Sequence, residues 1–292
     1  MNEASASAVA APVIGLPARM PVSRRRDDDP TPEPMQRLMR LHGPGELRAA
    51  LLAIVRTPGS RREFNAWRDE VSDVPSADAI RHDLDGLDPA ARMPWFELFC
   101  KRLAEAPPLQ RKQVAEAVRR VMRADGRVRP IDRLLWLAVR RQLGEAKSPL
   151  APAQGDNDLS GLTPDQVAAV AKYSAFVSRL IPQREVEAAL ADPTELPGER
   201  WFRTVMSHWP TATMTRPPVD GDALLRALRV IQALPWMLRP VLVRAWFEAA
   251  TELTEGQPLP IDAADALRLT CLLLDSPMPE GLARQFIEPA EH

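Results

Sequence analysis

The chain has 292 residues, of which 45% are hydrophobic, and its formal net charge is −1. This length and composition predict a globular protein of one or two domains with a hydrophobic core of its own. The near-neutral charge argues against a nucleic-acid-binding protein, and the sequence lacks the run of about 18 apolar residues that a membrane-spanning helix needs.

Many short helices are the predicted architecture. The chain contains 30 prolines, about twice the usual share of ~5%, and they stand between apolar stretches, where helices start and end. Apolar and polar residues hardly ever alternate with a period of two, which argues against β-sheets. The sequence therefore predicts an all-α, multi-helical fold.

The amino-terminal segment differs in composition from the rest. Residues 1–34 are rich in Ala, Ser and Pro, and three arginines directly precede three aspartates at residues 24–29. We expect a disordered tail here. No Lys or Arg precedes the apolar part of the tail, which argues against a Sec signal peptide. A type III secretion signal is the alternative interpretation.

Residues 35–144 form the predicted N-terminal helical region. Ser60 and Glu63 have the spacing of a capping box, in which each side chain accepts an N–H group at the helix start. Asp88 followed by Pro89 predicts an N-cap and the first residue of the next helix. The acidic run at residues 83–88 also suggests a calcium loop, but its glycine comes too early for an EF-hand. The cap interpretation is therefore favoured.

The end of this region is strongly basic. Residues 111–141 contain ten Lys or Arg residues against three acids, and the basic residues lie opposite an apolar helix face. The pattern is typical of the solvated face of an amphipathic helix. It also predicts a binding surface for an acidic protein, a nucleic acid or an anionic lipid surface. The candidate binding residues are Arg111, Lys112, Arg119, Arg120, Arg123 and Arg127.

Residues 145–162 contain several prolines, glycines and acids, and they form the predicted linker to the second region. The C-terminal region, residues 163–290, opens with a capping box at Thr163 and Gln166. We expect an intervening helical segment up to residue 208, which includes a helix near 184–191, and then a second linker at 210–221. The remaining helices run to about residue 287.

One short motif occurs twice. Residues 125–132 (DGRVRPID) return as residues 255–262 (EGQPLPID), with the acid, the Gly and the Pro-Ile-Asp at the same spacing. Each Gly is expected to end a helix in the left-handed conformation, and each Pro to start the next one. Asp132 and Asp262 are then expected to face the free N–H groups of the new helix. We interpret the pair as an internal duplication of one helical unit.

The same residues carry a family resemblance. Residues 88–95 (DPAARMPW), 124–128 (ADGRV) and 274–279 (LDSPMP) resemble the cytosolic carboxy-terminal region of bacterial membrane zinc metallopeptidases of the HtpX and CAAX-protease type. That region is similar to the TerB-like helical domain of tellurite-resistance proteins. The resemblance covers about residues 40–285. It implies two TerB-like helical units without the protease domain.

Two departures from that family limit what the resemblance implies. The catalytic H-E-x-x-H motif is absent, since none of the four histidines has a second His four residues away. The Ser or Thr that usually caps the second helix is replaced by Arg129 and Leu259, a loss of about 1 kcal/mol per cap. The resemblance therefore implies a fold and no catalytic activity.

Metal binding is the remaining chemical alternative, because TerB-like domains are associated with metal sites. The weak candidate ligands are Asp125, Asp132, Glu255 and Asp262. An Asp in the first turn of a helix already serves the backbone amides, and the positive end of the helix dipole disfavours a cation. We therefore expect no metal and no cofactor.

The cysteines indicate the compartment. Cys100 and Cys271 lie far apart in apolar runs without C-x-x-C spacing, so we expect buried free thiols and a reducing environment. Taken together, the sequence predicts a non-enzymatic protein-interaction module or adaptor in a bacterial cytoplasm. Its expected partner is a protein, acidic or membrane-associated, rather than a nucleic acid, and no small-molecule substrate is identified. The alternative is a type III-secreted effector or chaperone-like adaptor whose tail is the export signal.

Overall fold

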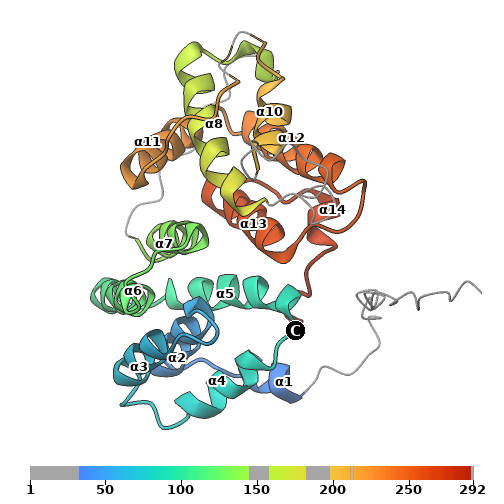
Figure 1. The fold of residues 1–292 in the computed structure, drawn as a ribbon. Coiled ribbons are helices and arrows are strands. Elements are labelled where there is room, and N and C mark those ends of the chain that lie inside the picture. The colour runs from blue at the N-terminus through green and yellow to red at the C-terminus, as the bar shows by residue number, and fades with distance from the viewer. Residues whose placement is uncertain (1–32, 145–157, 182–197, 211, 213, 291–292) are drawn as a thin grey trace, which may run out of the picture.

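The computed structural model describes residues 33–144, 158–181, 198–210, 212 and 214–290 (Figure 1). In these ranges every regular element is a helix, which confirms the all-α prediction. The first helices are α1 (Glu33–Met39), α2 (Pro44–Val55), α3 (Arg61–Glu70), α4 (Ala77–Asp85), α5 (Pro89–Leu103), α6 (Pro108–Arg123) and α7 (Pro130–Leu143). The later elements are the 3-10 helix η1 (Leu159–Gly161), α8 (Pro164–Val177), the 3-10 helix η2 (Ser178–Leu180), α10 (Glu199–Met206), α11 (Gly221–Gln232), α12 (Leu238–Leu253), α13 (Ile261–Leu274) and α14 (Glu280–Ala283).

Helix α2 is the centre of the N-terminal group of helices. Its residues 49–55 (AALLAIV) are all buried, because they are apolar on every side of the helix. Helices α3, α4, α5 and α6 pack around it. The indole N–H of Trp67 on α3 donates to the Ala49 carbonyl at 3.1 Å, which satisfies the one polar atom of a buried ring.

Helices α8, α10, α11, α12 and α13 form the second group (Figure 1). Buried hydrogen bonds join them: the Trp201 indole donates to the Trp246 carbonyl at 3.1 Å, and the Trp246 indole donates to Ser174 Oγ at 2.9 Å. The hydroxyls of Tyr173 and Thr270 lie 2.9 Å apart. Each of these buried polar atoms has a hydrogen-bond partner, and these bonds fix the orientation of the aromatic rings in the core of this group.

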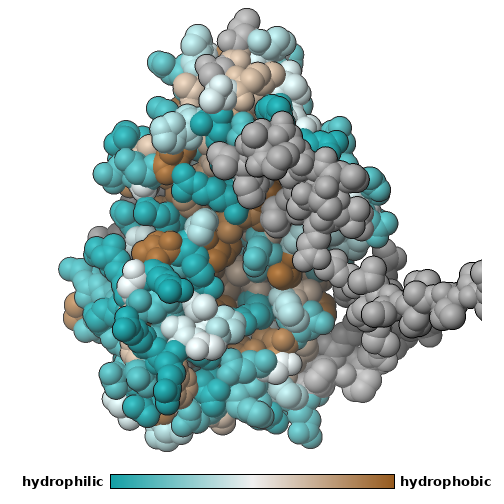
Figure 2. Space-filling view, viewed as in Figure 1, coloured by the Kyte–Doolittle hydropathy of each residue, from teal (hydrophilic) through white to brown (hydrophobic). Residues whose placement is uncertain are grey.

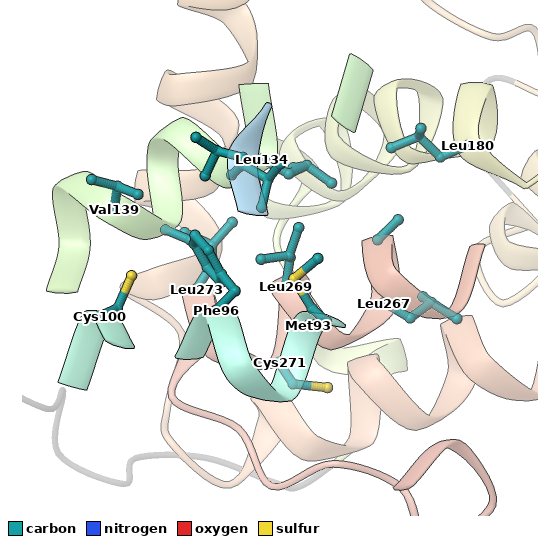
Figure 3. Close-up of a cluster of buried hydrophobic side chains, with 14 of the residues drawn as sticks. Met93, Phe96, Cys100, Leu134, Val139, Leu180, Leu267, Leu269, Cys271 and Leu273 are labelled. Atoms are coloured by element: carbon teal, nitrogen blue, oxygen red, sulfur yellow. The ribbon is translucent and has the colours of Figure 1, made fainter. Parts of the chain in front are cut away.

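The two groups meet where α7 packs on α13 and both pack on α5. Figure 3 shows Met93 and Phe96 of α5 close to Leu269 and Leu273 of α13, with Leu134 of α7 above them. The predicted regions 35–144 and 163–290 thus contribute to one continuous hydrophobic core.

The two cysteines are buried free thiols, as predicted. Burial raises the pKa of Cys271 to about 12, and it also raises the pKa of Cys100. Both thiols therefore stay protonated at neutral pH, which makes them poor nucleophiles.

Most predicted helix starts are confirmed. The Thr163 N–H donates to Gln166 Oε1 at 2.9 Å, and Thr163 Oγ1 accepts the Gln166 N–H at 3.4 Å, so this capping box is complete. Asp88 accepts the Ala90 N–H at 2.8 Å. The capping box at Ser60 is only half formed. Ser60 accepts the Glu63 N–H, but the Glu63 carboxylate turns away and accepts from the hydroxyl of Thr57 at 2.8 Å.

The predicted boundaries need several corrections. Helix α1 begins at Glu33, so the last two residues of the predicted tail are helical. Residues 158–162, assigned to the linker, contain η1, and Leu159 is buried there. The predicted second linker contains the buried Val219, and the last helix is short and ends at Ala283. The rest of the tail, residues 145–157 and the predicted helix at 184–191 lie outside the described residues.

The surface seen in Figure 2 is mostly hydrophilic, with hydrophobic side chains gathered near the middle of this face. Large apolar side chains that are exposed include Val128 and Trp236, each at 51%. No helix in the described ranges combines the length and the apolar character needed to cross a lipid bilayer.

Candidate functional site

The first copy of the repeated motif forms the turn between α6 and α7. Gly126 has φ +76°, the left-handed conformation predicted for it, and Asp125 Oδ1 accepts the Arg127 N–H at 2.8 Å. Asp132 is buried and accepts the Arg129 N–H at 2.8 Å and an Arg129 guanidinium N–H at 2.6 Å. Helix α7 therefore has a side-chain partner for its start. The Arg129 side chain itself caps no amide of α7, as expected, and the Asp132 carboxylate supplies the one side-chain contact to the backbone at this helix start.

The second copy forms the turn between α12 and α13. Gly256 also has φ +76°, as predicted. Helix α13 starts at Ile261, one residue later than expected, and Pro260 is its N-cap. Asp262 is exposed and makes no hydrogen bond to any described residue, so its predicted contact with the helix amides is wrong. The two corners thus agree at the glycine and differ at the aspartate, and the internal duplication stays a prediction.

The four weak metal candidates do not form a cluster. Asp125 accepts a backbone N–H, Asp132 is paired with Arg129, and Asp262 is exposed. Glu255 lies in the second turn with φ +52°. Among the described residues no group of three His, Cys, Asp or Glu side chains is arranged to hold a metal ion.

The side chains of two of the six predicted binding residues have a partner in the described part of the chain. Arg111 Nη1 donates to the Gly144 carbonyl at 3.2 Å, just beyond the end of α7. Arg120 Nη2 donates to Glu70 Oε2 at 2.9 Å, and this bond lowers the pKa of the Glu70 carboxyl. Arg111 and Arg120 therefore serve the contacts of α6 with α7 and with α3.

The other four predicted residues are exposed, and their side chains have no hydrogen-bond or ion-pair partner among the described residues. They are Lys112, Arg119, Arg123 and Arg127. Only Arg119 and Arg123 line the cleft between α6 and α7, which has a volume of about 120 Å³. Arg127 lies in a separate depression with Asp125 and Ser60. The predicted patch is therefore divided, and its centre is the α6–α7 cleft.

The structure adds two residues that the sequence analysis did not select. Arg133 and Trp136 of α7 line the cleft opposite Arg119 and Arg123. Arg133 and Trp136 are three residues apart, so they share one helix face. This spacing was the signal in the sequence. Val128, at 51% exposure, and Met122 complete the apolar part of the lining.

Positive charge predominates among the residues that line the cleft. Asp132 is the one acid among the described lining residues, and it is buried against the Arg129 guanidinium. Arg133 Nη1 lies against Gly221, where a Cβ would come within 2.0 Å of it. The start of α11 thus helps to position this arginine. The cleft presents three guanidinium groups around a half-buried indole ring, an arrangement suited to carboxylate groups.

No family model, curated protein or solved structure matches this chain. The likeness to the TerB-like region consequently rests on the short motifs in the sequence alone.

Proposed function

We propose that this protein is a non-enzymatic interaction module that binds an acidic segment of a partner protein in the α6–α7 cleft. The observation that carries the proposal is the set of three exposed arginines, Arg119, Arg123 and Arg133, that surround Trp136. None of them makes an ion pair with an acid in the described part of the chain, and Arg133 has only a longer-range attraction to Asp220. We further propose a cytoplasmic location, which the two buried free thiols favour.

The residue types suit protein binding. Arg and Trp are enriched among the residues that dominate binding energy at protein interfaces, and a guanidinium binds a carboxylate through two parallel hydrogen bonds. A single exposed ion pair contributes little, so an array of arginines is required for useful affinity. Val128 and Trp136 add apolar area that a purely electrostatic site lacks.

Aligning the two copies of the motif gives a second argument for a binding role of this helix face. An offset of 130 residues, from Asp125 to Glu255, places Arg119 and Arg123 at Ala249 and Leu253. Both of these are buried, at 3% and 9% exposure. The same offset places Arg133 and Trp136 at Ala263 and Ala266, which are fully buried. The helix face that forms the exposed cleft in the first copy is therefore an internal contact face in the second.

An acidic peptide is favoured over a nucleic acid or a membrane. The cleft is small, and Glu70 and Asp125 lie on the same surface as the basic residues, so no extended positive track suits a phosphate backbone. The chain as a whole has a net charge of −1. A short run of Asp or Glu with one or two apolar side chains matches both the charge and the lining.

Fluorescence anisotropy with a labelled peptide of Glu, Asp, Leu and Phe tests the proposal, with a Gln and Asn analogue as the neutral control. We expect the acidic peptide to bind and the neutral one to bind at least about tenfold more weakly, a difference of about 1.4 kcal/mol. The double variant Arg119→Glu/Arg123→Glu should lose most of the affinity. The affinity of the wild-type protein should fall as salt is raised from about 50 to 200 mM.

The matched control is the double variant Lys112→Glu/Arg127→Glu, which changes the net charge by the same amount on exposed residues outside the cleft. We expect its affinity to change by less than about threefold. Equal losses of affinity in both double variants would mean that the peptide is held by non-specific electrostatic attraction to the basic surface and not by contacts in the cleft. Stronger cleft-dependent binding of duplex DNA or phosphatidylserine vesicles would reject the acidic-peptide proposal.

A further inference from the structure

A groove of about 590 Å³ lies between α8 and the segment that joins α10 to α11. One wall is the face of α8 that carries Val167, Ala168 and Ala171. The opposite wall contains Trp209 and the pair Pro217 and Pro218. The volume falls within the range of about 300–1,000 Å³ that is usual for small-molecule sites.

The residues of α8 that line the groove are small, which leaves space between its two walls. Hydrogen bonds hold the opposite wall in place. The Trp209 indole N–H donates to the Leu159 carbonyl at 2.7 Å, which sets the orientation of the ring. Arg216 Nη1 donates to Ser178 Oγ at 3.1 Å, and Arg179 Nη2 donates to the Val219 carbonyl at 3.1 Å. Both ends of the proline pair are thereby tied to η2 and its neighbours, so the second wall does not depend on a ligand for its position.

The described lining residues include two cationic side chains, Lys172 and Arg216, and no acid. Arg216 is already engaged with Glu199, at 3.6 Å, and with Ser178. Lys172 is exposed at the edge of the groove and has no partner among the described residues. The groove therefore combines an apolar floor with one cation that is available to a ligand.

We propose that this groove binds a small amphiphilic carboxylate, of the kind represented by a medium-chain fatty acid. The apolar chain lies along Val167, Ala168 and Ala171 and against Trp209, and the carboxylate pairs with the Lys172 ammonium. Hydrophobic burial supplies most of the affinity, and the exposed ion pair supplies the preference for an anionic head group. The site is separate from the α6–α7 cleft, so it stands or falls independently of the proposed peptide binding.

Isothermal titration with decanoate, 1-decanol and decyltrimethylammonium below their micelle concentrations tests the charge preference. We expect decanoate to bind with one site per chain, and decyltrimethylammonium to bind at least about tenfold more weakly. Lys172→Gln should weaken decanoate by about two- to fivefold, as expected for loss of one exposed ion pair, and should leave 1-decanol unchanged. Ala168→Trp fills the groove and should weaken both decanoate and 1-decanol by at least about tenfold.

Two matched variants separate a local effect from a general one. Ala79→Trp adds the same ring on an exposed position of α4, and Lys112→Gln removes an exposed lysine of α6. Both should bind decanoate like the wild-type chain, and thermal unfolding followed by circular dichroism checks that every variant is folded. The proposal is rejected if decanoate does not bind, if Ala168→Trp binds it unchanged, or if the cationic amphiphile binds equally well.

Discussion

The α6–α7 corner and the α12–α13 corner have the same motif spacing, yet their carboxylates have opposite surroundings. In the first corner Asp132 is buried and accepts the Arg129 N–H, whereas in the second corner Asp262 is exposed. Three residues further on, the apolar Leu135 is buried in α7, while α13 has the largely buried acid Asp265. The motif thus specifies the turn, and the packing around it decides what each acid does.

A long-range contact accounts for the different role of Asp262. In the first corner, Arg129 precedes α7 and its N–H is free to bind Asp132. In the second corner, the equivalent Leu259 is buried, and its N–H donates to Gln285 Oε1 at 2.9 Å. Because the C-terminal segment satisfies this donor, Asp262 has no such N–H group to accept.

The largest effect should come from Asp265→Asn. Burial raises the pKa of Asp265 to about 7, against an ordinary value of about 3.9, and its Oδ1 has no partner among the described residues. Asp262 on α13 and Glu97 on α5 also raise this pKa, whereas Arg92 on α5 and Arg268 on α13 lower it. A raised carboxyl pKa means that ionisation favours the unfolded chain, so this group costs stability as the pH rises from about 4 to 7.

Above pH 7 this cost is constant, and a rise of the Asp265 pKa from about 3.9 to about 7 corresponds to about 4 kcal/mol. We therefore expect Asp265→Asn to raise the free energy of unfolding by about 2–4 kcal/mol at pH 8, with little change at pH 4. Urea unfolding at several pH values measures the difference. Asp262→Asn, on the same helix turn, removes only one of the charges that raise the pKa of Asp265, so it should give a smaller gain in stability at pH 8 than Asp265→Asn. Equal stability of Asp265→Asn and wild type at pH 8 would show that the carboxyl is not buried in solution.

The next effect separates the two corner aspartates directly. Asp132→Ala removes an N-terminal cap and leaves the Arg129 guanidinium without its acid, so it should cost about 1–2 kcal/mol. Asp262→Ala should change stability by less than about 0.5 kcal/mol, because the exposed carboxylate has no partner to lose. Urea unfolding at pH 7 compares the two variants. Equal losses would show that both acids cap their helices and that the corners are alike after all.

Local chemistry explains what the sequence predicted well. The caps at Thr163 and Asp88 and the left-handed glycines depend on residues within three or four positions of each other. Such features follow from backbone chemistry alone. The half-formed capping box at Ser60 shows where such local prediction fails. The Glu63 carboxylate accepts from the hydroxyl of Thr57, which lies in the turn after α2, before the helix begins.

Contacts between distant segments could not be predicted in the same way. The cleft needs Arg133 and Trp136 of α7 to face α6, and the groove brings Trp209 to α8 across about 40 residues of chain. Hydrophobic periodicity shows that a face is buried but not which helix covers it. For this reason the contact between α7 and α13 and the continuous core were outside the reach of the sequence analysis.

Gly126 and Gly256 are where the two corners should behave alike. Both have φ +76°, and a Cβ at either position would meet nothing within 4 Å, so only the backbone conformation opposes a larger residue. Ala at either site should cost about 1 kcal/mol. Unfolding free energies of Gly126→Ala and Gly256→Ala should therefore agree within about 0.5 kcal/mol. A neutral effect at one site and a loss at the other would show that the two glycines do not have the same backbone conformation in solution.

The smallest expected effect concerns Arg120, whose register partner in the second copy is the buried Ala250. Arg120 pairs with Glu70 on α3 at an exposed site, so a double-mutant cycle with Arg120→Ala and Glu70→Ala should give a coupling of only about 0.2–1 kcal/mol. The bond lowers the pKa of Glu70. Its contribution is therefore present above the ordinary glutamate pKa of about 4.3, and it is lost as the pH falls through the lower value of the folded chain. A coupling near zero at pH 7 would free Arg120 to join Arg119 and Arg123 in binding, and the charge-reversal experiment would then need Arg120→Glu as a third variant.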